Sequence, residues 1–418
     1  EIKTYLSLPK HLKIKTFRPQ IKKLENETRK FKEIPLKLYE PSWGSPLASI
    51  IVELERLRVK QLGGPVPPYI FFQLKEIFHW LESLGSSRIE GNRTTLAEFV
   101  EKIIEKTPRD THEEQIREIF NIDRAIDFIE KNIHYQTKIT RLHILEIHKI
   151  IVDGLTPPPG GEGSRYPGNL RPINVSIQKS SLVLPDSVKV QEYFDDLLAF
   201  VNAVRDQKDD LLVTALAHHR MTWIHPFDNG NGRMVRMFTY AMLIKQGFQV
   251  QTGRILNPTA IFCMNRDTYN DNLSKADTGE HEQVLAWCEY VLSGLKDEIE
   301  KIDHLLDRKY TTEKVLLPAL KFALDRQQIT SREYEILENL VKTEGMTLRS
   351  GDLEKIIGRE SVVQRSRIIK RLKDKGMLRP LKQSGRVYTV GFVNNYLLRG
   401  VIKSLEDNNF VPKSLNAR

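Results

Sequence analysis

The sequence predicts a mainly α-helical protein with one small β-hairpin, followed by a C-terminal winged helix-turn-helix. Three observations support this fold class. Apolar side chains recur at helical spacing through most of residues 45–324. Two short apolar runs, 173–177 and 181–185, flank a polar turn and are typical of a hairpin. After about residue 327 the order becomes helix, helix, basic helix and hairpin, which is the order of a winged helix.

The 418 residues suffice for two or three domains, because domains of roughly 100 to 200 residues are usual. We expect an N-terminal helical region at 1–100, a core at 101–300, a helical linker at 301–327 and the winged helix at 328–418. In chain order, helices are expected over 45–62, 69–90, 96–133, 140–155, 186–204, 210–224, 234–246, 331–345, 348–358 and 360–378. Two strands are expected within 379–392.

Composition and charge indicate one strongly basic segment and argue against a disulfide-bonded or membrane-spanning protein. The net charge is +10 but it is uneven, since ten Lys and Arg stand against two acids between Arg359 and Arg386. Cys263 and Cys288 lie in apolar segments, which predicts two buried free thiols rather than a disulfide. No apolar run approaches the ~20 residues of a membrane span, and no secretory pattern opens the chain. We therefore expect a cytoplasmic protein that does not cross a membrane.

The segment HPFDNGNGR, residues 225–233, stands directly before an apolar helix. A helix N-terminus offers free backbone N–H groups and the positive end of the helix dipole to an anion. Its glycines permit close backbone approach, and Arg233 and Arg236, three apart, share a helix face. A histidine with a pKa near 6.5 is a natural general base. The pattern predicts a polyphosphate site beside a base, and therefore transfer of a phosphorus-centred group to a hydroxyl.

The string HPFDNGNGRMVR resembles the signature of Fic-domain proteins, H-P-F-x-(D/E)-G-N-G-R-x-x-R. The helix ALAHHRMTWI before it, the segment GNLRPINVSI…LVLP and the segment NRDTYNDNL are similar to the family's approach helix, flap hairpin and nucleotide-ring segment. The resemblance covers about residues 30–300. It implies transfer of AMP from ATP to Ser, Thr or Tyr hydroxyls of target proteins and of the chain itself, with release of pyrophosphate.

The resemblance also implies a role for each matching residue. His225 would be the general base. ATP would be bound by Gly230, Asn231, Gly232, Arg233, Arg236, Tyr269 and Asn270. The flap would align the protein target by strand addition, through Arg171, Val175, Ser176 and Ile177.

Two positions depart from the family pattern. The family carries a carboxylate for Mg²⁺ where this sequence has Asn229, preceded by Asp228. Mg²⁺ prefers charged oxygen ligands, although an amide oxygen can coordinate it. We expect Asn229 to bind the ion weakly, or Asp228 to help through a water. The second departure is Asn270, where family members often have a second tyrosine.

A second motif, SSRIEGN at residues 86–92, resembles the family's inhibitory motif (S/T)-x-x-x-E-(G/N), as Ser86, Glu90 and Gly91. By itself it also fits a helix end closed by glycine. In the family this glutamate pairs with the second signature arginine, here Arg236. The pair would remove the partner of the γ-phosphate and place a negative charge where that phosphate binds. The resemblance therefore implies an intramolecular brake, N-terminal to the core.

The C-terminal module is a candidate for DNA or for protein docking, because winged helices do both. For DNA the expected contacts are Arg365, Arg367, Lys370, Arg371 and Arg386. Three alternatives to AMP transfer stay open. The first is a related reaction, either phosphate transfer or removal of AMP with Glu90 orienting water. The second is an ATP-sensing DNA-binding regulator, and the third is a toxin-like enzyme. The sequence leaves both a monomer and a homodimer open.

Overall fold

The computed structural model describes residues 31–60, 66–177, 180, 182–248, 255–358, 362–382 and 385–416. The first thirty residues of the expected N-terminal helical region lie outside this set. The turn of the expected C-terminal hairpin lies outside it in part, at residues 383–384.

Helices form most of the described chain, as the apolar periodicity predicted, and the mainly α fold class is confirmed. The helices before residue 310 are α3 (Pro46–Val59), α4 (Pro68–Glu90), α5 (Leu96–Ile104), α6 (Glu114–Asn132), α7 (Arg141–Ile151), α8 (Ser187–Asn202), η2 (Gln207–Asp209), α9 (Asp210–Ile224), α10 (Asn231–Lys245), α11 (Thr259–Met264), α12 (Arg266–Ala276) and α13 (His281–Leu305). Local signals fix several of their ends. Thr95 and Glu98 form a capping box that starts α5, and Gly91 ends α4 in the left-handed conformation at φ 109°.

The C-terminal part adds further helices and the only sheet among the described residues. Its elements are α14 (Arg308–Tyr310), η3 (Thr311–Leu316), α15 (Leu317–Asp325), α16 (Ser331–Lys342), β1 (Thr347–Arg349), η4 (Ser350–Asp352), α17 (Leu353–Ile357), α18 (Val362–Asp374), β2 (Leu378–Pro380), β3 (Val387–Val390), α19 (Leu397–Asp407) and η5 (Lys413–Leu415). The sheet order is β1-β3-β2, and both pairs are antiparallel. Leu348 faces Tyr388, and Arg379 faces Thr389.

Two expectations need correction. The hairpin expected at 173–177 and 181–185 is absent from the described part of this segment, which forms no strand. The helix expected at 348–358 is shorter, because its first residues form β1 against β3. A three-residue strand has no periodicity of its own, so its pairing depends on a partner about forty residues away. Helix α19 was not foreseen either.

The buried side chains form two clusters, and their boundaries differ from those of the four expected regions. One cluster is built from α3, α7–α10, α12, most of α13 and the second half of α6. The other is built from α4, α5, the first half of α6 and nearly everything from α15 to residue 415. Helix α4 therefore shares its core with the C-terminal third of the chain, although more than two hundred residues separate them.

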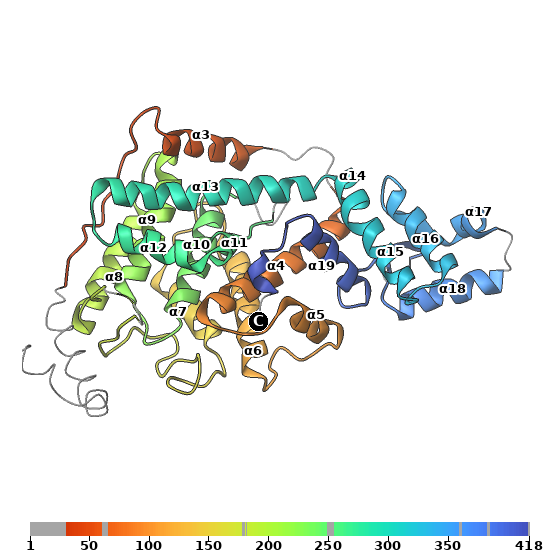
Figure 1. The fold of residues 1–418 in the computed structure, drawn as a ribbon, viewed down its shortest axis with the longest axis horizontal. Coiled ribbons are helices and arrows are strands. Elements are labelled where there is room, and N and C mark those ends of the chain that lie inside the picture. The colour runs from red at the N-terminus through yellow and green to blue at the C-terminus, as the bar shows by residue number, and fades with distance from the viewer. Residues whose placement is uncertain are drawn as a thin grey trace, which may run out of the picture.

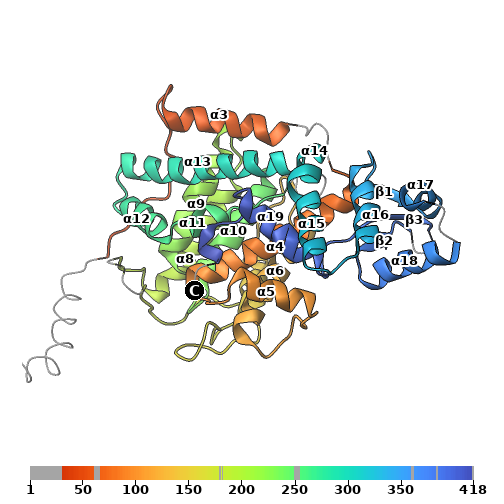
Figure 2. The same cartoon turned by 45° about the vertical axis from the view of Figure 1, so that its right-hand side comes forward.

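Specific contacts reinforce this sharing. The amide of Gln73 in α4 bridges the end of β3, since its Nε2 donates to Val390 O at 3.0 Å and its Oε1 accepts from Phe392 N at 2.9 Å. Helix α19 packs on α15, and Arg399 Nε lies 2.6 Å from Glu101 Oε1 in α5. Figures 1 and 2 show α16, α17 and α18 at one end of an elongated molecule, with α4 extending toward them.

Both cysteines are buried and free, as predicted from their apolar surroundings. Within the described ranges, no helix combines the length and the apolar character that crossing a bilayer would require.

We predict that deleting residues 328–418 destabilises the rest of the chain. The deletion exposes the apolar side chains by which α4 and α5 pack on the C-terminal residues. Each Leu, Ile or Phe that returns to water costs about 1.5 to 3 kcal/mol, so a loss of several residues lowers the melting temperature by roughly 10 °C or more. Differential scanning calorimetry measures this. An unchanged melting temperature would show that the C-terminal third folds independently of α4.

Candidate active site

The glycine loop lies between α9 and α10, the helices that the sequence predicted on either side of it. His225 ends α9 in the left-handed conformation (φ 49°), and Gly230 begins α10 in the same region (φ 76°). Asn231 holds the loop closed, because its Oδ1 accepts from Phe227 N at 2.9 Å and its Nδ2 donates to Phe227 O at 2.8 Å. The side chain of Asn231 is thus used within the loop. Any cradle for an anion here would come from backbone N–H groups.

His148 of α7 packs against the loop, a contact that the sequence analysis did not predict. Its ring stacks on Phe227 at 3.7 Å between centroids. Its Nδ1 accepts from Gly168 N and its Nε2 faces Asn229 O, both at 3.0 Å, so the proton lies on Nε2. Burial lowers the pKa of His148 to about 4, which keeps this arrangement neutral. The only sequence signal was its place on the apolar face of α7.

His225 is half-buried and has the geometry of a proton acceptor. Its Nδ1 lies 3.2 Å from the carbonyl oxygen of Thr222, so Nδ1 carries the proton and the lone pair of Nε2 is available. Burial lowers the pKa of His225 to about 4, against a smaller raising effect of the Thr222 carbonyl. The ring is therefore neutral at pH 7, as a general base must be before it takes a proton.

Arg171 contacts the backbone at the start of the glycine loop. It is buried, and its guanidinium donates to the carbonyl oxygens of His225 at 2.8 Å, Ile173 at 2.9 Å and Pro185 at 2.6 Å. Its backbone N–H donates to Pro226 O at 2.8 Å. Arg171 thus joins both ends of the flap segment to His225. Within that segment Val175 and Ile177 are half-buried and Ser176 is exposed.

Arg236 and Glu90 form an ion pair at the start of α10. Arg236 Nη2 lies 2.7 Å from Glu90 Oε1, and Ser86 accepts twice more from Arg236, through Oγ at 2.8 Å and through its carbonyl oxygen at 2.9 Å. Burial raises the pKa of Glu90, but the charge and hydrogen bond of Arg236, with Arg233, outweigh burial and lower it overall. Glu90 is therefore charged at neutral pH.

The Glu90 carboxylate also fills the space above the glycine loop. A Cβ added to Gly232 would lie 2.1 Å from Glu90 Oε1. Real Cβ atoms do not approach an oxygen so closely, so this carboxylate position requires glycine at residue 232. A negative group therefore already occupies the helix N-terminus at which the sequence predicted phosphate binding.

Arg233 is completely buried and pairs with other glutamates than Glu90. Its Nη1 lies 3.2 Å from Glu118 Oε1 in α6, and its Nη2 donates to the carbonyl oxygen of Glu162 at 2.5 Å. Glu118 also accepts from Asn92 Nδ2 at 2.7 Å, next to the brake motif. Glu118 was missed from the sequence, because an acidic residue in an amphipathic helix normally faces solvent.

The residues expected at the metal site serve mainly to hold the loop. Both carboxylate oxygens of Asp228 accept hydrogen bonds, from Ser164 Oγ and from Arg165 N. Asn229 Nδ2 donates to Gly163 O at 2.9 Å, which leaves its Oδ1 as a ligand. No group of three or more His, Cys, Asp or Glu within the described ranges could hold a metal. One neutral amide oxygen does not make a protein site for Mg²⁺.

Tyr269 and Asn270, expected beside the adenine, are neighbours in α12 but differ in exposure. Tyr269 is buried, and its hydroxyl lies 2.8 Å from His218 Nε2, while its ring packs on Phe262 at 4.9 Å between centroids. Asn270 is exposed on α12. Tyr269 therefore belongs to the wall of the core, and only Asn270 is freely accessible.

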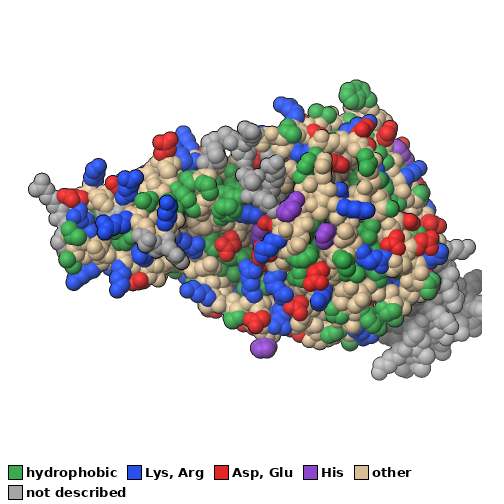
Figure 3. All heavy atoms as spheres, turned by 180° about the vertical axis from the view of Figure 1, so that it is seen from behind, with side chains coloured by type: hydrophobic (Ala, Val, Ile, Leu, Met, Phe, Trp, Pro, Cys, Tyr) green, Lys and Arg blue, Asp and Glu red, His purple; other side chains and the backbone are tan. Residues whose placement is uncertain are grey.

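The basic residues of α18 do not form one surface. Arg365 Nη1 pairs with Glu354 at 2.7 Å, and Arg371 Nε pairs with the buried Glu333 at 2.6 Å on another side of the helix. Arg371 is thus paired within the module. Arg367, Lys370 and Arg386 are exposed and form no ion pair with any residue that the structure describes. Lys and Arg side chains are spread over this end of the molecule in Figure 3.

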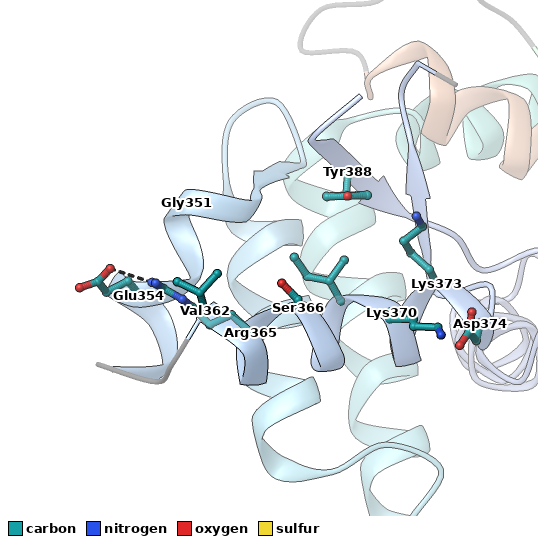
Figure 4. Close-up of a pocket in the computed structure, with 10 residues that line it drawn as sticks. Gly351, Glu354, Val362, Arg365, Ser366, Lys370, Lys373, Asp374 and Tyr388 are labelled. Atoms are coloured by element: carbon teal, nitrogen blue, oxygen red, sulfur yellow. Dashed lines mark hydrogen bonds and ion pairs between the residues drawn. The ribbon is translucent and has the colours of Figure 1, made fainter. Parts of the chain in front are cut away.

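An open groove of about 680 Å³ lies along α18. Figure 4 shows the side chains that line it. Arg365, Lys370 and Lys373 line it together with Glu354 and Asp374, so both signs of charge face the groove. The ion pair of Arg365 with Glu354 crosses one end.

The Fic/DOC family model matches residues 138–243, which include α7, α9, the glycine loop and nearly all of α10. This part of the chain is a Fic domain. The chain is 27% identical over 206 residues to the "Protein adenylyltransferase Fic" of Drosophila willistoni and 27% identical over 207 residues to that of Nematostella vectensis. These matches span 48% and 47% of this chain but only 37% and 42% of the two relatives.

The fold of the Fic domain and its surroundings has a counterpart among solved structures. A Fic family protein from Desulfovibrio desulfuricans G20 superposes with a TM-score of 0.50 at 17% sequence identity. The superposition covers 84% of this chain and 98% of that protein. Such a likeness supports the fold and does not by itself assign a reaction.

We predict that the rate of any reaction using His225 as its base is independent of pH between about pH 5.5 and 8. A pKa lowered to about 4 keeps the imidazole neutral throughout this range. Replacing Glu90 would lower this pKa further, since Glu90 raises it. Initial rates measured across the range in a Glu90→Gly variant test this. A fall centred near pH 6.5 would mean that the working ring is solvated.

Proposed function

We propose that the protein is an adenylyltransferase that moves AMP from ATP to hydroxyl groups of proteins, itself included, and that Glu90 holds it inactive. The observation that carries this proposal is the Glu90 carboxylate, paired with Arg236 and seated against Gly232 beside His225. A carboxylate placed where a phosphate would bind is what a resident inhibitor of a polyphosphate site requires. The names of the curated relatives agree with the proposal, but the chain spans about two fifths of their length.

The proposed reaction follows from the groups around the loop. Nε2 of His225 takes the proton of a Ser, Thr or Tyr hydroxyl, and the resulting oxygen attacks the α-phosphorus of ATP. The bond from that phosphorus to the β-phosphate oxygen breaks, and pyrophosphate leaves with the electron pair. Backbone N–H groups at the start of α10 and a freed Arg236 stabilise the negative charge of the phosphates.

We propose that the phosphates of ATP would hold a divalent cation for the most part, because Asn229 offers a neutral Oδ1 and both carboxylate oxygens of Asp228 already accept hydrogen bonds. Such an ion neutralises phosphate charge when it is bound. The flap segment is proposed to receive the target. Residues 175–177 are partly exposed and belong to no helix or strand, so their backbone could accept an added strand, while Arg171 ties this segment to His225.

Labelled ATP tests the proposal. We predict that Glu90→Gly incorporates label from α-³²P-ATP but not from γ-³²P-ATP, and about ten- to a hundredfold faster than wild type, because a partly buried charged pair is worth about 1.4 to 3 kcal/mol. Gel autoradiography with intact mass measures the transfer. Arg236→Ala in the same background should reverse the gain, and His225→Ala should reduce the rate by about 10² to 10⁴-fold.

The same experiment separates the alternatives. Label from γ-³²P-ATP would indicate a kinase, and label from neither nucleotide would favour an ATP sensor. Loss of AMP from a premodified target, dependent on Glu90, would favour AMP removal. A Glu90→Gly variant that is no faster than wild type while His225 stays essential would exclude Glu90 as the brake.

We also propose a second candidate function, nucleic-acid binding by the C-terminal module. It is supported by the element order of residues 331–390 and by three exposed cations that no described acid neutralises, Arg367, Lys370 and Arg386. Arg365 and Arg371 contribute less, because each is paired with a glutamate. Cations that are exposed and unneutralised are the ones that can displace counterions from phosphates.

We predict a salt-sensitive gel shift with duplex DNA that the triple variant Arg367→Gln, Lys370→Gln, Arg386→Gln strongly weakens, whereas Arg371→Gln weakens it little. Removing three phosphate contacts reduces the slope of log affinity against log salt by about 2.7. Fluorescence anisotropy at several salt concentrations measures this slope. Absent or salt-independent binding would instead favour a docking site for protein.

A further inference from the structure

The last turn of α4 is held by the C-terminal end of the chain. Arg88 lies two residues before Glu90, and its Nη2 donates to the carbonyl oxygen of Ser414 at 2.9 Å. Its Nη1 donates to Thr94 O at 3.4 Å, just beyond the brake motif. One turn of α4 thus carries a side chain that reaches Arg236 and another that reaches η5.

The element that receives Arg88 is itself firmly packed. Ser414 Oγ donates to the carbonyl oxygen of Cys263 at 2.9 Å, and Leu415 is completely buried. Segment η5 contacts both α4 and α11. A Cβ on Gly85 would lie 3.2 Å from Cys263 Sγ, so α4 and α11 are also in close contact at this level. The end of the chain therefore closes a packed unit around the last turns of α4.

The position of Glu90 depends on this turn remaining helical. Beyond the hydrogen bonds within the helix itself, two backbone hydrogen bonds close this turn, Gly91 N to Arg88 O and Asn92 N to Ser87 O, both at 3.1 Å. Helix ends fray, and the Glu90 side chain is 27% exposed while its partner Arg236 is 1% exposed. A cation near a helix C-terminus is favourable, and fixing that cation to η5 restrains the turn further.

We propose that Arg88 is a positioning residue of the brake and that η5, Lys413–Leu415, is its anchor. Displacing η5 frees the last turn of α4, and with it Glu90. Through Arg88, the C-terminal third of the chain contacts the same helix turn that places Glu90 against the glycine loop. This inference rests on the proposed function for its effect on activity, but not for its effect on the α4 turn.

The test uses the full chain with two changes, each made with and without Glu90→Gly. Arg88→Met keeps the apolar stem and removes the donors, and deletion of residues 413–418 removes the anchor. In the wild-type background both should raise self-modification by about three- to tenfold, the effect of losing one partly exposed charge-assisted hydrogen bond. In the Glu90→Gly background neither should change the rate, because the carboxylate being positioned is gone.

Lys413→Met is the matched control. It changes an exposed side chain of the same segment and leaves the Ser414 carbonyl oxygen in place, so its rate should equal that of wild type. A change that merely destabilises the fold would lower the rate in both backgrounds. If the deletion fails to fold, Arg88→Met alone carries the test.

Hydrogen exchange supplies a readout that does not depend on activity. Amides of residues 86–92 should exchange faster in Arg88→Met and in the deletion, but not in Lys413→Met. Unchanged exchange in both would overturn the inference whatever the activity, as would an equal rise in rate with Glu90→Gly present. Faster exchange with no transfer by any variant would support the anchor and contradict the proposed transferase.

Discussion

The ion pair between Glu90 and Arg236 is the contact on which the rest of the site depends. Arg236 is 1% exposed, and a buried cation without a partner is costly by several kcal/mol. Ser86 satisfies two further donors of the guanidinium, and Gly232 leaves room for the carboxylate. Any anion that replaces Glu90 must therefore supply comparable negative charge and hydrogen bonds. Under the proposed function, the phosphates of ATP would supply both.

Helix α4 makes that contact sensitive to distant parts of the chain. Its first half is fixed to the end of β3 through Gln73, and its last turn is fixed to η5 through Arg88. Between these points its apolar face belongs to the C-terminal core. The helix thus carries Glu90 at one end, and the C-terminal third of the chain supports it. Removing the C-terminal third would therefore take away the support of α4 and destabilise the rest of the chain.

Most polar residues of the glycine loop build the loop rather than act on a ligand. Asn231 closes it, Asp228 holds the segment at 164–165, and Arg171 fixes the backbone on which His225 stands. The lone pair of His225 Nε2 remains available to accept a proton. Burial keeps that imidazole neutral, so the scaffold sets both its direction and its protonation state.

The sequence by itself predicted most of the helices and the glycine loop, and the resemblance to the Fic family predicted the pairing of Glu90 with Arg236. Helical periodicity, a glycine at a helix end and a run of special residues are local signals, readable without knowledge of packing. It did not determine β1, α19, the two cores or the supporting roles of His148, Glu118 and Arg88. Each of these depends on a partner brought near by folding, such as the carbonyl oxygen of Ser414 for Arg88. The sequence also could not show that Arg365 and Arg371 are paired. A basic residue on a predicted helix does not reveal which acidic residues will face it in the folded chain.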